Sequence, residues 1–395
     1  MVSKATSLML LLSFFAVITA EYAEKEDYTL EIDQKLGSNA AGCSMYRCKK
    51  SSQTFSSNVC SWYDKNYDIY YVQTCLESQT CTAGTKAGEN YTCITTPTTK
   101  LQAYPGEKCS TAADCVNSVG CTNGICEGTA TGSACTTSAQ CIPGDSCQKV
   151  AGTDVCTELI PVGKTGCAND YDCAYNAGCN IVSATTLTDN TCVEYLSLTP
   201  GSQVQELSCV GNYTNLCSSG YCAKTGTGTT AQYLCTDELK SNHSLPWKCY
   251  STESEACVSN VDTHTGLYAI STCSCSFSPH GDAYCKPLLG DTPYKRLTQQ
   301  NYKWVTSKYV SSCNTERRLW PSNLNCIQDY WTDTEAATMI YYGYALSSYT
   351  EIQGAEDCVM NVFEYEYLAA KKAYGKDEAA REITLAVALL ISLIA

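Results

Sequence analysis

Hydrophobic side chains are concentrated at the two ends of the 395-residue chain and are sparse between them. One apolar run covers residues 7–18 and another covers residues 383–395, whereas only 30 of the 190 residues from 101 to 290 are Leu, Ile, Val or Phe. So little apolar surface cannot offset the conformational entropy of folding on its own. Gly, Thr, Ser, Asn and Asp fill this stretch, which favours short β-ribbons and loops.

The pattern changes after residue 290, where Tyr and Trp become frequent. The segment Thr332-Asp-Thr-Glu335 fits a capping box, and the residues after it have the apolar spacing of a helix. Residues 356–372 show a similar spacing and predict a second helix. We expect residues 291–375 to form a partly α-helical subdomain near the membrane. Its links back to the rest of the chain would be Cys313, Cys326 and Cys358.

The first twenty residues have the layout of a secretory signal peptide. Lys4 supplies the positive charge, residues 7–18 are the apolar region, and Ala20 is the small residue at the expected cleavage point. The alternative is an uncleaved membrane helix, but the run is shorter than the ~20 residues that span a bilayer. Cleavage after residue 20 is the preferred interpretation.

The last residues are typical of a signal for a glycosylphosphatidylinositol (GPI) anchor. The tail, residues 383–395, is uncharged and follows a polar spacer at 376–382, with Gly375 as the expected attachment residue. Attachment at Ala373 or Ala369 would lengthen the spacer. A buried terminal helix or a tail anchor is the alternative. A GPI anchor would place the protein on the extracellular face of the plasma membrane, with the membrane as a partner through the lipid.

Cysteine spacing carries the strongest signal in the chain, because 30 cysteines are present and three successive triplets have five residues in every gap. With a fourth cysteine each, these triplets and a more variable group make four quartets. The sixteen residues are Cys109, Cys115, Cys121 and Cys126; Cys135, Cys141, Cys147 and Cys156; Cys167, Cys173, Cys179 and Cys192; and Cys209, Cys217, Cys222 and Cys235. Four cysteines allow three connectivities, of which first-to-third with second-to-fourth is our preference.

We therefore predict small disulfide-rich modules, mostly short β-ribbons and loops in an elongated array, with the partly helical subdomain at the C-terminal end. The expected divisions are a signal peptide at 1–20, a six-cysteine module and linker at 21–99, four repeats at 100–240, a variant cysteine module at 241–290, the helical region at 291–375 and the anchor signal at 376–395.

Charge and residue types exclude several functions. The formal net charge of −14 argues against nucleic acid as a partner. Zinc sites usually use Cys-x2-Cys pairs, which do not occur here, so disulfides are expected and no metal or other cofactor is predicted. The chain has no Gly-x-Ser-x-Gly, and its three histidines, His243, His264 and His280, stand in polar contexts. We expect no catalytic residues and no enzyme activity.

Three sequons, at Asn90, Asn212 and Asn242, predict N-glycosylation of an exported chain. Tyr is abundant, with 29 residues against 5 Phe. Tyr can serve as the amphipathic core residue of a polar domain, which is the preferred interpretation, or as a binding surface for carbohydrate or protein.

The array at residues 106–235, with the segments GEKCSTAADCVNSVGCTNGIC and GSACTTSAQCIPGDSC, resembles the Dickkopf N-terminal cysteine-rich repeats. With its leader and tail, the chain resembles the GPI-anchored cysteine-rich surface antigens of ciliates. The resemblance implies a non-enzymatic coat, adhesion or antigenic-display protein. A receptor-type or signalling ectodomain that binds an extracellular protein or carbohydrate is the alternative.

Overall fold

The computed structural model describes the central part of the chain and leaves parts of both ends aside. The described residues are 45–46, 59–64, 66, 69–74, 79–82, 92–95, 102–116, 120–227, 231–249, 257–276, 282–347 and 349–353. The expected leader, the helix at 356–372, the anchor signal with Gly375, and the residues Asn90, His280 and Cys358 lie outside them.

Short antiparallel ribbons form the described chain up to residue 285, which is the architecture that the composition predicted. The N-terminal strands are β1 Met45–Tyr46, β2 Val59–Asp64, β3 Ile69–Thr74, β4 Gln79–Thr82 and β5 Thr92–Thr95. The array strands are β6 Cys121–Thr122, β7 Ile125–Cys126, β8 Asp145–Val150, β9 Thr153–Glu158, β10 Ala177–Asn180, β11 Thr191–Glu194, β12 Gln203–Val204, β13 Cys222–Thr225 and β14 Gln232–Cys235. The last strands are β15 Lys248–Cys249, β16 Cys257–Val258, β17 Ile270–Ser271, β18 Cys273–Cys275 and β19 Ala283–Cys285.

Each repeat is built on one hairpin whose two strands carry the third and fourth cysteines directly opposite each other. The opposed pairs are Cys121 and Cys126 in β6–β7, Cys147 and Cys156 in β8–β9, Cys179 and Cys192 in β10–β11, and Cys222 and Cys235 in β13–β14. Instead of joining to each other, they bond to the first and second cysteines, respectively. All four quartets therefore have the first-to-third, second-to-fourth pairing that we preferred from the sequence.

Residues 241–290 contain a fifth copy of the same unit. Cys249 bonds to Cys273 and Cys257 bonds to Cys285, and Cys273 lies opposite Cys285 in β18–β19. The Cα–Cα distances of 6.0 and 5.6 Å match the 5.9–6.0 Å and 5.5–5.7 Å of the four predicted repeats. Long gaps and the additional Cys275 hide this repeat in the sequence.

A glycine opens each of the first four repeats because the chain turns there with a positive φ. Gly106, Gly132, Gly163 and Gly201 have φ values of 92°, 81°, 80° and 81°, a region that other L-residues avoid. Each glycine N–H donates to the carbonyl of its repeat's fourth cysteine at 2.7–3.0 Å. The glycine thus closes the repeat onto its hairpin without any side chain.

Four α-helices follow the array in the described residues. They are α2 Thr292–Val305, α3 Leu324–Tyr330, α4 Asp333–Ser347 and α5 Tyr349–Ile352. The predicted start of α4 is confirmed, since the Thr332 hydroxyl donates to the Glu335 carboxylate at 2.9 Å and accepts the Glu335 N–H at 3.3 Å. Helices α2 and α3 were not predicted, although Pro293 at the first turn of α2 is a common start signal.

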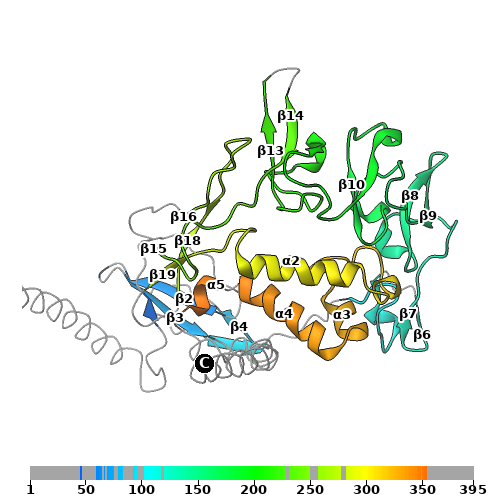
Figure 1. The fold of residues 1–395 in the computed structure, drawn as a ribbon. Helices are drawn as coiled ribbons and strands as arrows, with labels where there is room; N and C mark the ends of the chain where they lie inside the picture. Colours follow the sequence, from blue (N-terminus) through cyan, green and yellow to red (C-terminus); the bar gives the residue numbers. More distant parts are fainter. Residues whose placement is uncertain are drawn as a thin grey trace, which may run out of the picture.

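The array is bent, and it curves around the helices (Figure 1). Repeats from β6 to β14 follow one another along an arc, while α2 and α4 lie on its inner side. Between them is a hydrophobic core that the sequence did not lead us to expect. The fully buried Trp304, Ile327 and Met339 of the helices pack in one cluster with Val204 and Cys217 of the fourth repeat.

The expected covalent link from the helices to the array through Cys313 and Cys326 is wrong. These two cysteines bond to each other, 6.2 Å apart between Cα atoms, and clip the segment before α3. The contact between the helical part and the first three repeats is made by hydrogen bonds and an ion pair instead, as described below.

Candidate functional site

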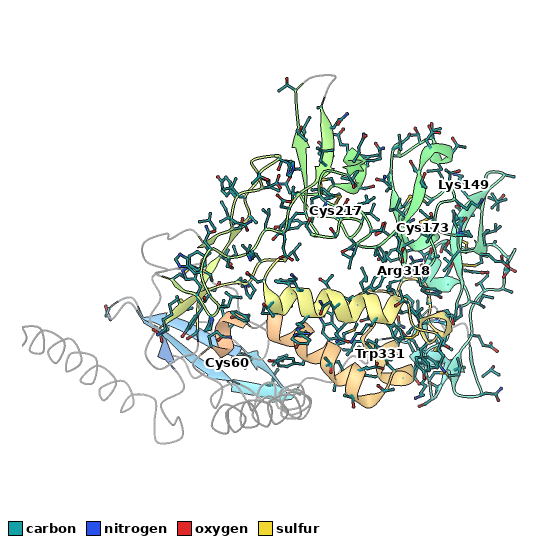
Figure 2. The ribbon with its side chains drawn as sticks, in the orientation of Figure 1. Cys60, Lys149, Cys173, Cys217, Arg318 and Trp331 are labelled. Carbon is teal, nitrogen blue, oxygen red and sulfur yellow. A yellow bond between two sulfur atoms is a disulfide. The ribbon has the colours of Figure 1, made fainter. Side chains whose placement is uncertain are left out.

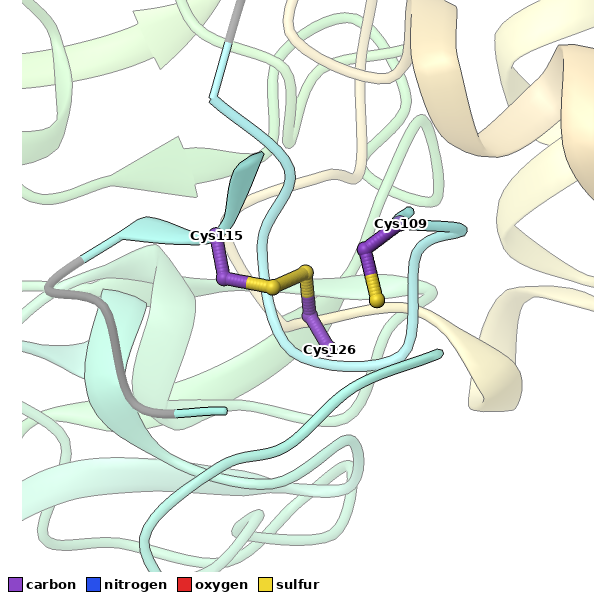
Figure 3. A group of neighbouring side chains, drawn as sticks. All are labelled: Cys109, Cys115 and Cys126. Carbon is purple, nitrogen blue, oxygen red and sulfur yellow. A yellow bond between two sulfur atoms is a disulfide. The ribbon is translucent and has the colours of Figure 1, made fainter. Parts of the chain in front are cut away.

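All sixteen predicted quartet cysteines are in disulfides, and in the first, second, third and fifth repeats three of the sulfur atoms lie close enough to resemble a metal site. The Sγ atoms of Cys109, Cys115 and Cys126 lie within 4.8 Å of one another, and Figure 3 shows the Cys109 sulfur beside the bond that joins the other two. Because Cys109 itself is bonded to Cys121, the repeat holds no thiolate to bind a metal. These residues are structural staples.

Two of the three predicted glycosylation sites are described, and both are exposed. Asn212 has a φ of 69° in a tight turn of the fourth repeat. The Asn242 amide donates to the Ser259 carbonyl at 3.0 Å. Both side chains can be reached from solvent.

The two described histidines lie in the fifth repeat. His243 packs against Trp247 with ring centroids 4.4 Å apart. The exposed His264 has its Nδ1 3.6 Å from the Asp237 carboxylate, and Asp262 completes a small acidic group. The Asp262 carboxylate already accepts the N–H groups of Asp237 and Thr265.

The segment 313–318 connects the helical part to the first three repeats, and sequence reasoning missed it. At its centre is Arg318, which is only 1% exposed. Its guanidinium donates to four main-chain carbonyls of the third repeat, those of Tyr171, Cys173, Ala174 and Ala177. Figure 2 shows Arg318 beside Cys173, between that repeat and the helices. No carboxylate among the described residues forms an ion pair with it.

Neighbouring side chains of the same segment bind the second and third repeats. The Asn314 amide donates to the carbonyls of Ser138 and Cys141 at 2.8 and 2.9 Å. The Thr315 hydroxyl donates to the Tyr171 carbonyl at 2.7 Å. The connection is therefore a set of polar side chains that satisfies main-chain carbonyls of the repeats, which buried backbone requires.

The first repeat is held by an ion pair. The Arg317 Nε lies 2.8 Å from the Glu107 carboxylate, which is buried, and the Arg317 guanidinium lies 3.7 Å from the Tyr104 ring centroid. Burial raises the pKa of Glu107, whereas the Arg317 charge and the Tyr104 N–H act in the opposite direction. The Tyr330 hydroxyl of α3 also donates to the Gly106 carbonyl.

One sequence signal could have revealed this segment. The chain contains five arginines, none between residues 48 and 295, and two of them are adjacent at 317 and 318. Arg is the residue best suited to buried, multiply hydrogen-bonded positions. A lone Arg-Arg pair after an array without arginine therefore indicates an internal contact.

A pocket of about 370 Å³ lies over Arg318, between the third repeat, the fourth repeat and residues 316–322. Its lining residues are Asn169, Asp170, Tyr171, Ile181, Tyr195, Asn215, Glu316, Arg318, Leu319 and Ser322. The lining combines carboxylates, amides and tyrosines from three segments that are distant in sequence.

The carboxylates of the pocket are partly desolvated. Burial raises the pKa of Asp170, while the Cys179 N–H and the Arg318 charge act to lower it. Burial also raises the pKa of Glu316, with the Ala139 N–H and Arg317 acting in the opposite direction. The pocket therefore disfavours the ionised form of both carboxyl groups.

The described residues contain no helix long and apolar enough to cross a membrane. No protein-family model, curated protein or solved structure matches the chain. The disulfides themselves, twelve of which join described cysteines, are those of an extracellular or secreted protein.

Proposed function

We propose that this protein is a non-enzymatic, GPI-anchored surface protein that acts in coat structure, adhesion or antigenic display. The observation that carries the proposal is the array of five stapled repeats. Each repeat projects a hairpin from a core of two disulfides, and the repeats are supported from inside by the helices.

The hairpins vary in length while their disulfides do not. The gap between the third and fourth cysteines is 4, 8, 12, 12 and 11 residues in the five repeats, yet the Cα–Cα distance of the second bond stays at 5.5–5.7 Å. A constant frame with variable loops supports a protein whose outer surface is exposed to recognition. The resemblance to ciliate surface antigens is part of the same proposal.

The test of anchoring is release from intact cells by a phosphatidylinositol-specific phospholipase C. We expect the protein to move from the cell pellet to the supernatant and to gain the epitope that the cleaved anchor leaves. A variant truncated after residue 375 should appear in the medium without treatment. Retention of the full chain on phospholipase-treated cells would contradict the anchor.

A receptor-type ectodomain is the second candidate, and the polar pocket over Arg318 is the observation that favours it. Saturable capture of a single extracellular ligand by the intact purified protein would support this role. Binding spread over many unrelated surfaces would support the coat role instead.

A further inference from the structure

We infer that the pocket over Arg318 binds a neutral sugar ring of a glycan. This goes beyond the proposed role at the cell surface, because it assigns a binding site and a ligand class. A volume of about 370 Å³ lies within the range of roughly 300–1,000 Å³ that small-molecule sites have. The site is also open on one side to exposed residues, so a terminal residue of a longer glycan can enter it.

Hydrogen-bond acceptors are fixed in the pocket before any ligand enters. Oδ1 of Asp170 accepts the Cys179 N–H at 2.8 Å, which orients the carboxylate and leaves Oδ2 for a ligand. Oδ1 of Asn169 accepts the Tyr171 N–H at 2.8 Å, which leaves the amide NH₂ as a donor. Carboxylates and amides held in this way match the vicinal hydroxyl groups of a pyranose, which both donate and accept.

An aromatic ring and aliphatic side chains supply the apolar face that the C–H groups of a sugar need. Tyr171 is 41% exposed at the pocket, and Ile181 and Leu319 also line it. A tyrosine that is partly exposed to solvent is suited to this contact, since its ring is apolar and its hydroxyl can hydrogen-bond.

Charge argues against an ionic ligand. All five N–H groups of the Arg318 guanidinium are directed at protein oxygens, so none is left for a phosphate or sulfate. The pocket therefore offers an anion no free cationic donor, and burial, which raises the pKa of Asp170 and of Glu316, weakens the carboxylate charge that a cation would need. A neutral polyhydroxyl compound is the class that remains.

The back of the pocket is formed by a rigid part of the third repeat, so the site exists before a ligand binds. Gly178 lies on β10 where a Cβ atom would come within 2.8 Å of the Tyr195 ring and 2.9 Å of the Asp170 carboxylate. The missing side chain therefore allows Tyr195, which is 4% exposed, and Asp170 to pack closely against β10 where they line the pocket. The Cys167–Cys179 and Cys173–Cys192 bonds hold the same hairpin.

The experiment is saturation-transfer difference NMR on the intact oxidised protein with methyl glycosides of glucose, galactose, mannose and N-acetylglucosamine. We expect saturable transfer from at least one glycoside, with a dissociation constant in the millimolar range for a single ring. Tyr171→Ala and Asn215→Ala should each weaken that binding about tenfold, and Glu316→Gln should weaken it as well. Tyr268→Ala is the control, because Tyr268 is 52% exposed but lies in the fifth repeat, and it should bind as the wild type does.

Three results would overturn the inference. They are no transfer from any of the four glycosides, binding that survives both Tyr171→Ala and Asn215→Ala, or displacement of the glycoside by inorganic sulfate or tetramethylammonium. Mass-spectrometric disulfide mapping of each variant shows that the repeats are still folded. The NMR experiment uses soluble protein, so a failure of glycoside binding would not contradict the anchor proposal. A failure of phospholipase release would likewise not contradict the sugar-binding inference.

Discussion

At the scale of single residues, the third repeat depends on one buried cation. Loop-rich repeats leave main-chain carbonyls without ladder partners, and buried carbonyls need donors. Arg318 supplies five N–H groups in one planar fork, so a single side chain satisfies several of them. This explains why the chain places an arginine in segment 313–318, although the array that it contacts contains none.

Arg318→Lys should therefore be costly although the charge is kept. Lysine has three donors on a flexible stem and leaves at least one of the four third-repeat carbonyls unsatisfied, which should lower the free energy of unfolding by roughly 2–4 kcal/mol. Denaturant unfolding measures the change. Arg296→Lys on the exposed side of α2 is the matched control and should change stability by less than about 0.5 kcal/mol. Equal effects of the two variants would contradict the assigned role.

The third repeat also depends on the side chain of Asp172. Its side chain closes the turn before Cys173 by accepting the Ala168 and Asn169 N–H groups at 2.7 and 3.3 Å, and the residue is 2% exposed. Asp114 makes the same contacts in the first repeat, with the N–H groups of Ser110 and Thr111. The recurring Asp-Cys pair in the sequence is thus a turn-closing device.

Burial raises the pKa of Asp172 above its ordinary value of 3.8. A carboxyl group with a raised folded-state pKa stabilises the fold most below the unfolded value, and this contribution is lost as the pH rises through the folded value. We expect the melting temperature of the wild type to fall between pH 4 and pH 7, and Asp172→Asn to reduce that fall. Asp154→Asn, in the exposed β8–β9 hairpin, should follow the wild-type profile. A profile unchanged by Asp172→Asn would refute the prediction.

At the scale of elements, the hairpin and its two crossing disulfides form the repeating unit. The two bonds differ in exposure. In the first repeat Cys109 and Cys121 are partly exposed, whereas Cys115 and Cys126 are 0% and 3% exposed. In the third repeat all four cysteines are buried.

Graded reduction should therefore open the disulfides in a set order. Access of a thiolate to the sulfur controls the rate of exchange. We expect Cys109–Cys121 to be reduced before Cys115–Cys126, and both before Cys173–Cys192. Pulsed alkylation with two isotopic labels, followed by peptide mass spectrometry, reads the order directly. Simultaneous loss of all three bonds would show that they open only with the whole fold.

At this scale, elements marked by a short continuous sequence pattern were predictable, and elements whose pattern is interrupted by an insertion were not. Even spacing of five residues pointed to a repeat with one preferred pairing, and the Thr332–Glu335 capping box marked the start of α4. The fifth repeat was not predicted, because an insertion separates its second and third cysteines and the additional Cys275 obscures the four-cysteine pattern. Helix α2 escaped because its first residues are polar and its buried side chains, Trp304 and Val305, are at its end.

At the scale of the whole molecule, the helices form an apolar core against which the third and fourth repeats pack. Trp304 is fully buried there, its ring centroid is 5.5 Å from that of Trp331, and its Nε1–H donates to the Arg317 carbonyl at 3.2 Å. The fifth repeat has a separate small cluster around Trp247. The third and fourth repeats thus share one apolar core with the helices on the inner side of the arc.

Trp304→Ala should weaken the fold beyond the helix that carries it. Truncation of a buried Trp costs about 3–5 kcal/mol, and the loss should spread to the elements that share its cluster. Hydrogen exchange measured by mass spectrometry should show lower protection in the third and fourth repeats as well as in the helices. Trp247→Ala, the control from the other cluster, should lower protection within the fifth repeat only. Deprotection confined to α2 after Trp304→Ala would contradict a shared core.

The arrangement of the whole molecule could not be obtained from the sequence, because it depends on contacts between distant segments. Asn314 reaches carbonyls more than 170 positions earlier, and no local pattern encodes such a pairing. Composition suggested that disulfides replace a core in the array, which is right for the single repeats. It could not show that the aromatic residues after 290 fill the inside of the bend.

The turn at the end of β8–β9 has a practical consequence for protein engineering. Only Ala151 and Gly152, both with positive φ, connect the two strands, and the opposed Cys147 and Cys156 lie four positions before and four positions after this turn. A foreign peptide inserted between Lys149 and Asp154 would sit outside the two covalent bonds that define the repeat. The second repeat can therefore serve as a scaffold for grafted loops, because its two disulfides lie outside the grafted segment.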